Sequence, residues 1–123
     1  MSRARARVTL KLASSLDGRI ALASGASKWI TGAKAREAVH KLRSEHDAVL
    51  TGSGTVLADD PALTARPGGR LARRQPRRVI LDSTLATPPG AALFSQPGGG
   101  GVLVFTTQND PLAREALETS GAE

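Results

Sequence analysis

Three short apolar segments, each separated from the next by turns and helical patterns, constrain the fold of this chain more than any other feature. They occupy residues 48–50, 78–81 and 102–105, and their length and composition are typical of strands buried in a sheet. Asp110 and Pro111 predict the N-cap and first residue of a helix after the last strand. Strands that alternate with helices predict an α/β fold with a mixed or parallel sheet.

Four further segments complete the predicted pattern. Apolar side chains alternate with others over residues 8–12, a period of two that predicts a half-buried strand. Thr31 is the predicted N-cap of a helix that runs to about Arg43, and a short helix is expected over 55–58. Residues 66–78 carry six arginines with little periodicity, which predicts a solvated loop.

The composition excludes several kinds of site. The chain has no cysteine, so a disulfide, a thiolate zinc site and a cysteine nucleophile are excluded. Its two histidines, His40 and His46, lie across a predicted helix end at a spacing that suits a metal poorly, so we expect structural roles and no metal. Without an apolar run of about 20 residues, or the apolar core of a secretory signal, the chain is expected to be cytoplasmic.

The basic character of the chain has two interpretations. The net charge is +6, and thirteen of the seventeen basic residues are arginine. A nucleic-acid-binding module that uses residues 66–78 is one interpretation, because phosphate neutralisation dominates sequence-independent binding. A solvated loop is the other, and it is favoured because aromatic stacking residues and the motifs of nucleic-acid-binding folds are missing.

Two features could bind a phosphate-bearing small molecule. Gly52 and Gly54 directly follow a predicted strand, where glycine lets the backbone approach a phosphate. Leu57 stands where a dinucleotide-binding fingerprint has its third glycine, so a plain strand-to-helix turn remains the alternative. Arg43 and Arg66 could hold an anion as bidentate forks, and a solvated helix end and a solvated loop are the alternatives.

Other candidate residues also leave alternatives open. Trp29 could stack on a flat ligand ring or fill the core. Lys11 stands between apolar residues of the predicted N-terminal strand, and a solvent-facing lysine is favoured over a functional one. Asp59 and Asp60 are consecutive, so their side chains are expected to point apart, and a joint acid–base role is not expected.

Several longer segments resemble one known family. Residues 11–19 (KLASSLDGR), 27–31 (SKWIT), 47–66 (DAVLTGSGTVLADDPALTAR) and 78–83 (RVILDS) are similar, in order and spacing, to the reductase domain of the bifunctional riboflavin-biosynthesis deaminase–reductases. The resemblance covers about residues 8–107. It implies a dihydrofolate-reductase-like fold, with a mixed sheet flanked by helices, and NADPH as hydride donor. The implied reaction reduces the ribosyl side chain of 5-amino-6-(5-phosphoribosylamino)uracil to the ribitylamino form.

The resemblance also implies which residues form the site, and no metal is among its components. The substrate and its phosphate would be held by Ser27, Arg43, Leu63 (through its backbone) and Arg66. The NADPH site would be lined by Ala13, Trp29, Gly52, Gly54, Thr55, Asp59 and Ser83. Lys11 and Asp59 are the implied catalytic residues, because Lys11 would reach the reacting sugar and Asp59 would lie between cofactor and substrate.

The same resemblance predicts the domain organisation. Residues 1–7 are a basic lead-in, and 8–123 are expected to be the N-terminal portion of a reductase domain without a deaminase domain. No Glu-Gly-Gly-type turn follows Gln108, so the sheet is expected to be incomplete. Family members commonly dimerise through this domain, and a homodimer is therefore expected for the full-length form. A non-catalytic fragment is the alternative.

Overall fold

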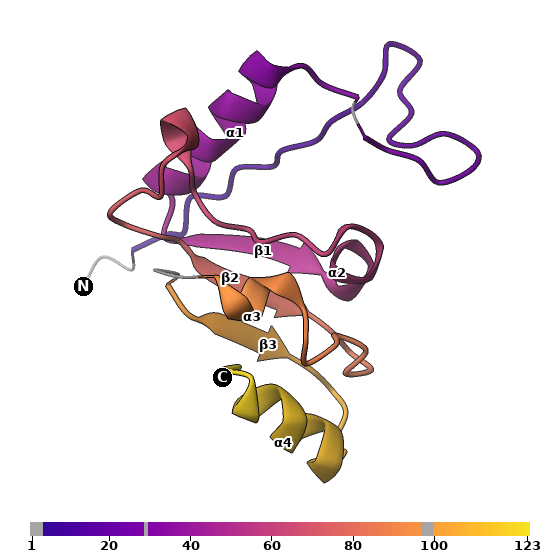
Figure 1. The fold of residues 1–123 in the computed structure, drawn as a ribbon, viewed down its shortest axis with the longest axis vertical. Helices are drawn as coiled ribbons and strands as arrows, with labels where there is room; N and C mark the ends of the chain where they lie inside the picture. Colours follow the sequence, from indigo (N-terminus) through magenta and orange to yellow (C-terminus); the bar gives the residue numbers. More distant parts are fainter. Residues whose placement is uncertain (1–3, 29, 97–99) are drawn as a thin grey trace. The chain divides into compact units, whose positions relative to one another are not determined.

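The computed structural model describes residues 4–28, 30–96 and 100–123 and divides into two compact units. The first unit comprises the chain up to Val39, and the second comprises His40–Glu123. The division falls within helix α1, which spans Ala33–Glu45. Figure 1 shows the elements of each unit.

In the first unit, the predicted N-terminal strand is wrong. Residues 8–12 form no strand, and their apolar side chains are highly exposed, 87 % for Val8 and 71 % for Leu12. A strand needs a neighbour for its backbone N–H and C=O groups, and no strand in the described ranges pairs with this segment. The predicted turn at Asp17-Gly18 is present, with the Gly18 N–H donating to the Ser15 carbonyl at 2.9 Å.

Helix α1 begins one residue later than predicted and ends about two residues later, at Glu45. Its first intrahelical bond runs from the Arg36 N–H to the Gly32 carbonyl at 3.1 Å, which makes Gly32 the N-cap in place of Thr31. Glycine is accepted at an N-cap. Thr31 contributes its carbonyl instead, which accepts from Arg36 Nη1 at 2.5 Å.

The three buried strands are confirmed, and they form one parallel sheet in the second unit. The strands β1 (Ala48–Gly52), β2 (Arg77–Leu81) and β3 (Val102–Phe105) lie in the order β1-β2-β3. Val79 of β2 is paired with Leu50 of β1 and with Leu103 of β3. Within the described residues, all strand pairs of this sheet are parallel. The sequence predicts either a mixed or a parallel sheet.

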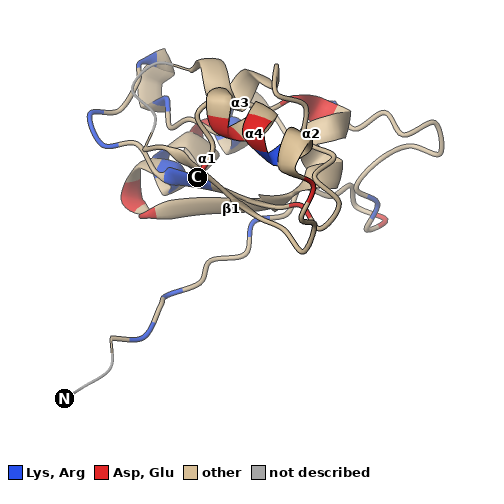
Figure 2. Ribbon diagram, turned by 90° about the horizontal axis from the view of Figure 1, so that it is seen from below, with Lys and Arg blue, Asp and Glu red and all other residues tan. Residues whose placement is uncertain are grey.

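Three helices connect to these strands and lie on the same side of the sheet (Figure 2). They are α2 (Ser53–Asp59), α3 (Ala92–Ser95) and α4 (Pro111–Thr119), and a 3₁₀ turn spans Pro67–Gly69. This one-sided arrangement follows from right-handed crossovers between successive parallel strands. The predicted cap of α4 is confirmed, because Asp110 Oδ1 accepts from the Leu112 N–H at 3.0 Å. Among the described helices, none is long and apolar enough to span a membrane.

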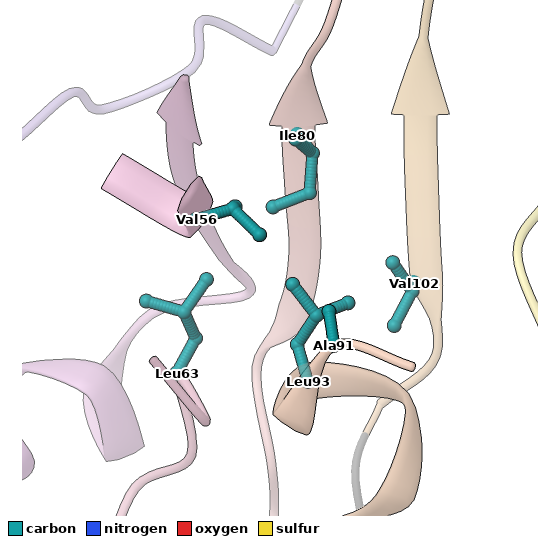
Figure 3. Close-up of a cluster of buried hydrophobic side chains, with 6 residues drawn as sticks. All are labelled: Val56, Leu63, Ile80, Ala91, Leu93 and Val102. Atoms are coloured by element: carbon teal, nitrogen blue, oxygen red, sulfur yellow. The ribbon is translucent and has the colours of Figure 1, made fainter. Parts of the chain in front are cut away.

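The core of the second unit lies between the sheet and these helices. Figure 3 shows its buried side chains pointing toward one another from β2, β3, α2, α3 and the loops between them. They are Val56, Leu63, Ile80, Ala91, Leu93 and Val102. Leu50, Leu81 and Phe105 occupy the opposite face of the sheet in the register and are exposed. The core is therefore built almost wholly from aliphatic side chains.

Gly100 packs against the backbone where β2 begins. An added Cβ would lie 2.7 Å from the Gln75 carbonyl oxygen and 2.9 Å from the Pro76 carbonyl carbon. Because these are backbone atoms, Gly100→Ala is expected to lower the free energy of unfolding by about 1–3 kcal/mol, measured by urea denaturation. Gly90→Ala is the matched control, since a Cβ there meets nothing within 4 Å. Equal losses in the two variants would contradict this packing.

Candidate functional site

Four of the predicted cofactor-binding residues lie at the carboxyl ends of β1 and β2. Gly52 is the last residue of β1, Gly54 and Thr55 belong to the first turn of α2, and Ser83 follows β2 by two residues. A Cβ added at Gly52 or Gly54 would meet no atom within 4 Å, so internal packing does not require glycine at either position. Open α/β sheets bind ligands at this edge, and the open backbone suits a ligand that approaches closely.

Asp82 ties the two loops at this edge together. Its side chain, in a residue only 1 % exposed, accepts from the Ala86 N–H at 2.9 Å and the Thr87 N–H at 2.8 Å. Burial acts to raise the pKa of Asp82, but hydrogen bonds from Thr87, Ala86 and Ser53 outweigh it and hold the pKa below its ordinary value. Sequence reasoning assigned Asp82 no role, although an aspartate between a buried strand and a Ser-Thr turn is the signal that could have found it.

The two consecutive aspartates have different surroundings. Asp59 is the last residue of α2 and is exposed. Asp60 has a left-handed backbone with φ 42°, and its Oδ1 accepts from the Ala92 N–H at 2.8 Å. Asp60 therefore joins the end of α2 to the start of α3, while the Asp59 carboxylate is left at the surface of the second unit.

Arg66 is held at its backbone and at its side chain. Its N–H donates to His40 Nδ1 at 3.1 Å, so this ring nitrogen is an acceptor. Its Nε donates to Thr64 Oγ1 at 3.1 Å, and its Nη2 donates to Gln96 Oε1 at 3.0 Å. The Arg66 guanidinium consequently has a defined place between the loop that carries it and the end of α3.

The residue before Arg66 is fixed in the same way. Gln75 clamps the backbone of Ala65: its Oε1 accepts from the Ala65 N–H at 2.8 Å, and its Nε2 donates to the Ala65 carbonyl at 2.9 Å. Leu63, two residues earlier, is buried with φ 55°, a left-handed conformation that is strained for a residue with a Cβ. The loop 63–66 is thus a rigid, locally strained segment.

Arg43 contacts the same loop from the end of α1. Its Nη1 donates to the Thr64 carbonyl at 3.2 Å, so Thr64 accepts from both Arg43 and Arg66. Burial lowers the pKa of Arg43. Within residues 4–28, 30–96 and 100–123, no carboxylate pairs with either guanidinium. Two cations that share one buried threonine, without an acidic partner, are chemically suited to bind an anion.

The structure therefore brings together Arg43, Leu63 and Arg66 of the predicted substrate set. It adds four residues that sequence reasoning missed as partners of this loop: His40, Thr64, Gln75 and Gln96. His40 was expected to be structural, but no partner could be named for it. The contacts to Arg66 span 26 residues from His40 and 30 from Gln96, and no local pattern signals pairs so far apart.

The remaining predicted site residues belong to the first unit. There Lys11 is exposed, Ala13 is half-buried, and Ser27 is half-buried in the wall of a hollow of about 690 Å³. Asp17, Arg19 and Lys28 also line this hollow. Trp29 lies outside the described residues.

The arginine-rich loop is only partly solvated. Arg70 and Arg73 are exposed as predicted, Arg74 forms an ion pair with Asp47, and Arg77 forms one with Glu123. The prediction is wrong for Arg78, which is 4 % exposed and donates through Nη1 to the Leu93 carbonyl.

Period-two alternation explains the burial of Arg78. Its position in β2 places it on the same face of the sheet as Ile80, two residues further along the strand, and this face lies under α3. Burial lowers the pKa of Arg78. In the described part of the chain, no His, Asp or Glu cluster could hold a metal ion.

Comparisons with known proteins agree on one family. The family model described as the RibD C-terminal domain matches residues 6–119. The riboflavin biosynthesis protein RibD of Chlamydia pneumoniae is 48 % identical over 103 residues, which cover 83 % of this chain and 27 % of that protein.

Solved structures show the same likeness. The diaminohydroxyphosphoribosylaminopyrimidine deaminase/5-amino-6-(5-phosphoribosylamino)uracil reductase of Thermotoga maritima is similar with a TM-score of 0.67 at 36 % identity, over 90 % of this chain and 36 % of that chain. The riboflavin biosynthesis reductase Rib7 of Saccharomyces cerevisiae has a TM-score of 0.58 at 32 % identity, over 78 % and 39 %. These likenesses confirm the expected α/β, dihydrofolate-reductase-like fold. This chain spans less than two fifths of each relative named.

Proposed function

The chain belongs to the RibD C-terminal domain family, and on that premise we propose that it reduces the ribosyl side chain of 5-amino-6-(5-phosphoribosylamino)uracil to the ribitylamino form with NADPH. The observation that carries the substrate half of this proposal is the pair Arg43 and Arg66: both bind Thr64, and neither pairs with a carboxylate of the described residues. A phosphate dianion matches two such guanidinium groups in charge and in hydrogen-bond geometry.

NADPH, when bound, supplies the hydride, and the protein contributes binding and orientation. Gly52, Gly54, Thr55 and Ser83 are the proposed cofactor contacts in the second unit, and they fit this role because the backbone at the two glycines faces open space. Ala13 and Trp29 are the proposed contacts from the first unit. Asp82 holds the two loops that carry the second-unit contacts in place.

The substrate contacts and catalytic residues complete the assignment. Ser27 and the backbone of Leu63 join the two arginines as substrate contacts, and the strained, rigid loop 63–66 preserves their positions. Lys11 reaches the reacting sugar, and Asp59, exposed at the end of α2, lies between cofactor and substrate. Correct placement of donor and acceptor is the main contribution a protein makes to hydride transfer. We place the reaction in the cytoplasm, with residues 8–123 as the N-terminal portion of a reductase domain that forms a homodimer in its full-length form.

Arg66→Ala tests the phosphate assignment. The variant is expected to raise the KM for the phosphorylated substrate by about tenfold to a hundredfold, because a charge-assisted hydrogen bond contributes about 1.5–3 kcal/mol. The dissociation constant for NADPH should stay within about twofold, since Arg66 lies outside the proposed cofactor contacts. NADPH absorbance during turnover and NADPH titration by calorimetry measure the two quantities.

Arg70→Ala is the matched control, because Arg70 is exposed in the arginine-rich loop 66–78. This substitution should change neither the KM for the substrate nor the dissociation constant for NADPH. The proposal fails for the phosphate if the unmutated chain binds the phosphorylated and dephosphorylated substrates equally. It fails for the reaction if the chain consumes no NADPH in the presence of the substrate.

A further inference from the structure

We infer that Thr64 and Gln96 hold the Arg66 guanidinium by one edge, and that Gln96 is a positioning residue that sets the affinity of the site for a phosphorylated ligand. This inference rests on the proposed function and deepens it. It concerns how the phosphate-binding cation is aimed, which neither the resemblance nor the sequence pattern assigns to any residue.

The chemistry of the guanidinium group decides which of its edges remains free. Arginine presents five N–H donors in one plane, and the Nε–H and one Nη2–H point along the same edge. Thr64 Oγ1 accepts from Nε at 3.1 Å and Gln96 Oε1 accepts from Nη2 at 3.0 Å, so the protein occupies that edge. The second Nη2 hydrogen and one Nη1 hydrogen form the end-on edge of the fork, which takes no acceptor among the described residues, and the other Nη1 hydrogen points toward the Cδ side.

Among the described residues, nothing accepts from the complementary edge of Arg43. Its Nη1 donates to the Thr64 carbonyl at 3.2 Å, which leaves its Nε and Nη2 as a side-on pair. A phosphate bound by both residues would therefore meet the end-on edge of Arg66 and the side-on edge of Arg43. The buried Thr64 is the shared acceptor that holds both guanidinium groups in these orientations.

The acceptors that fix Arg66 are neutral oxygens, and this preserves its charge. A carboxylate in the place of Gln96 would hold the same edge but would neutralise the cation that a phosphate needs. An amide fixes the geometry and leaves the positive charge for the ligand.

Gln96 is itself held by the packing of the element before it. It follows α3, whose Leu93 is fully buried and whose Leu93 carbonyl accepts from the buried Arg78. Arg78 thus anchors the helix end from the sheet, and Gln96 extends from that anchored end to Arg66. This chain of contacts links the interior of the sheet to the orientation of the phosphate-binding arginine.

A double-mutant cycle on the full chain tests the inference, with inorganic phosphate as the probe and its dissociation constant measured by ³¹P NMR titration. Gln96→Met removes the acceptor but keeps the length of the side chain, and it is expected to weaken phosphate binding about fivefold to tenfold. In the Arg66→Ala background the same substitution should have no further effect, because Gln96 acts through Arg66. Gln96→Glu should also weaken binding, through neutralisation of the Arg66 charge.

Gln108→Met is the matched control, since Gln108 is exposed after β3, and it should leave phosphate binding unchanged. A merely structural role of Gln96 predicts an equal loss in both backgrounds, or a lower unfolding midpoint without a change in phosphate affinity, and either result overturns the inference. If Arg66→Ala weakens binding and Gln96→Met does not, the inference alone fails. If Arg66→Ala has no effect, the proposed phosphate site fails, and the role of Gln96 fails with it.

Discussion

Leu63→Ala is expected to lower the free energy of unfolding by about 2–5 kcal/mol, and Leu63→Gly is expected to be the more stable of the two variants. The first effect follows because Leu63 is 5 % exposed within the buried cluster, and truncation of a packed leucine leaves a cavity. The second follows because Leu63 has φ 55°. A residue with a Cβ pays about 1–2 kcal/mol in this region, whereas glycine adopts it freely.

The decisive measurement is which of the two variants at position 63 has the higher free energy of unfolding, determined by urea denaturation. Leu93 supplies the matched control, because it is equally buried but lies within helix α3. There glycine should be less stable than alanine by about 1 kcal/mol, the reverse of the order at Leu63. The same order at both positions would show that residue 63 does not hold a left-handed backbone.

Asp82→Ala is expected to lower the free energy of unfolding by about 3 kcal/mol or more and to weaken NADPH binding. The substitution leaves the N–H of the buried Thr87 and the N–H of Ala86 without their acceptor, and a hydrogen bond to a charged group contributes about 1.5–3 kcal/mol. The affinity for NADPH should fall because Asp82 also receives a hydrogen bond from Ser53, next to the two glycines at the end of β1. Denaturation and NADPH titration measure the two effects.

The pH dependence of stability gives an independent test of Asp82. Because the folded protein holds the pKa of Asp82 below its ordinary value, this carboxylate stabilises the fold fully above the pKa of the unfolded chain, about 3.9. That contribution is lost as the pH falls through the lowered folded-state value. The unmutated chain should therefore lose stability below about pH 4, and Asp82→Asn should lose less over the same range.

Glu115→Gln is the matched control for the loss of one carboxylate, since Glu115 is exposed on α4. A profile of Asp82→Asn that runs parallel to that of the unmutated chain would contradict the assignment. It would mean that the Asp82 carboxylate has the same proton affinity in the folded and unfolded states.

Local patterns predicted the elements whose signals are short in range. All three buried strands, the α/β class and the Asp110 cap follow from apolar runs and capping chemistry within a few residues. The prediction of a strand over residues 8–12 is wrong. The alternation of apolar and polar residues describes a single strand and carries no information about the partner strand with which it would have to pair. A second segment must supply the hydrogen bonds, and a period of two does not say whether one is present.

In the candidate site too, the sequence predicted some features and only the tertiary structure showed others. The chemistry of arginine made Arg43 and Arg66 candidate anion ligands, and the resemblance gave them, with Leu63, their expected roles. Neither could indicate that one threonine binds both guanidinium groups. The expected solvation of residues 66–78 failed at Arg78 because the alternation within β2, together with the helix above it, buries this side chain.

By itself, the amino-acid sequence determined the strands, the class of fold, the absence of cysteine chemistry and the family to which the chain belongs. These properties depend on composition and on neighbours in the sequence, which the order of residues states directly. Only the tertiary structure decided that Arg66 is fixed by His40, Thr64 and Gln96, that Asp82 joins two loops, and that Leu63 is strained. The contacts of Arg66 with His40 and Gln96, and of Asp82 with Ser53, join residues far apart along the chain, and they arise when packing of the core brings those residues together.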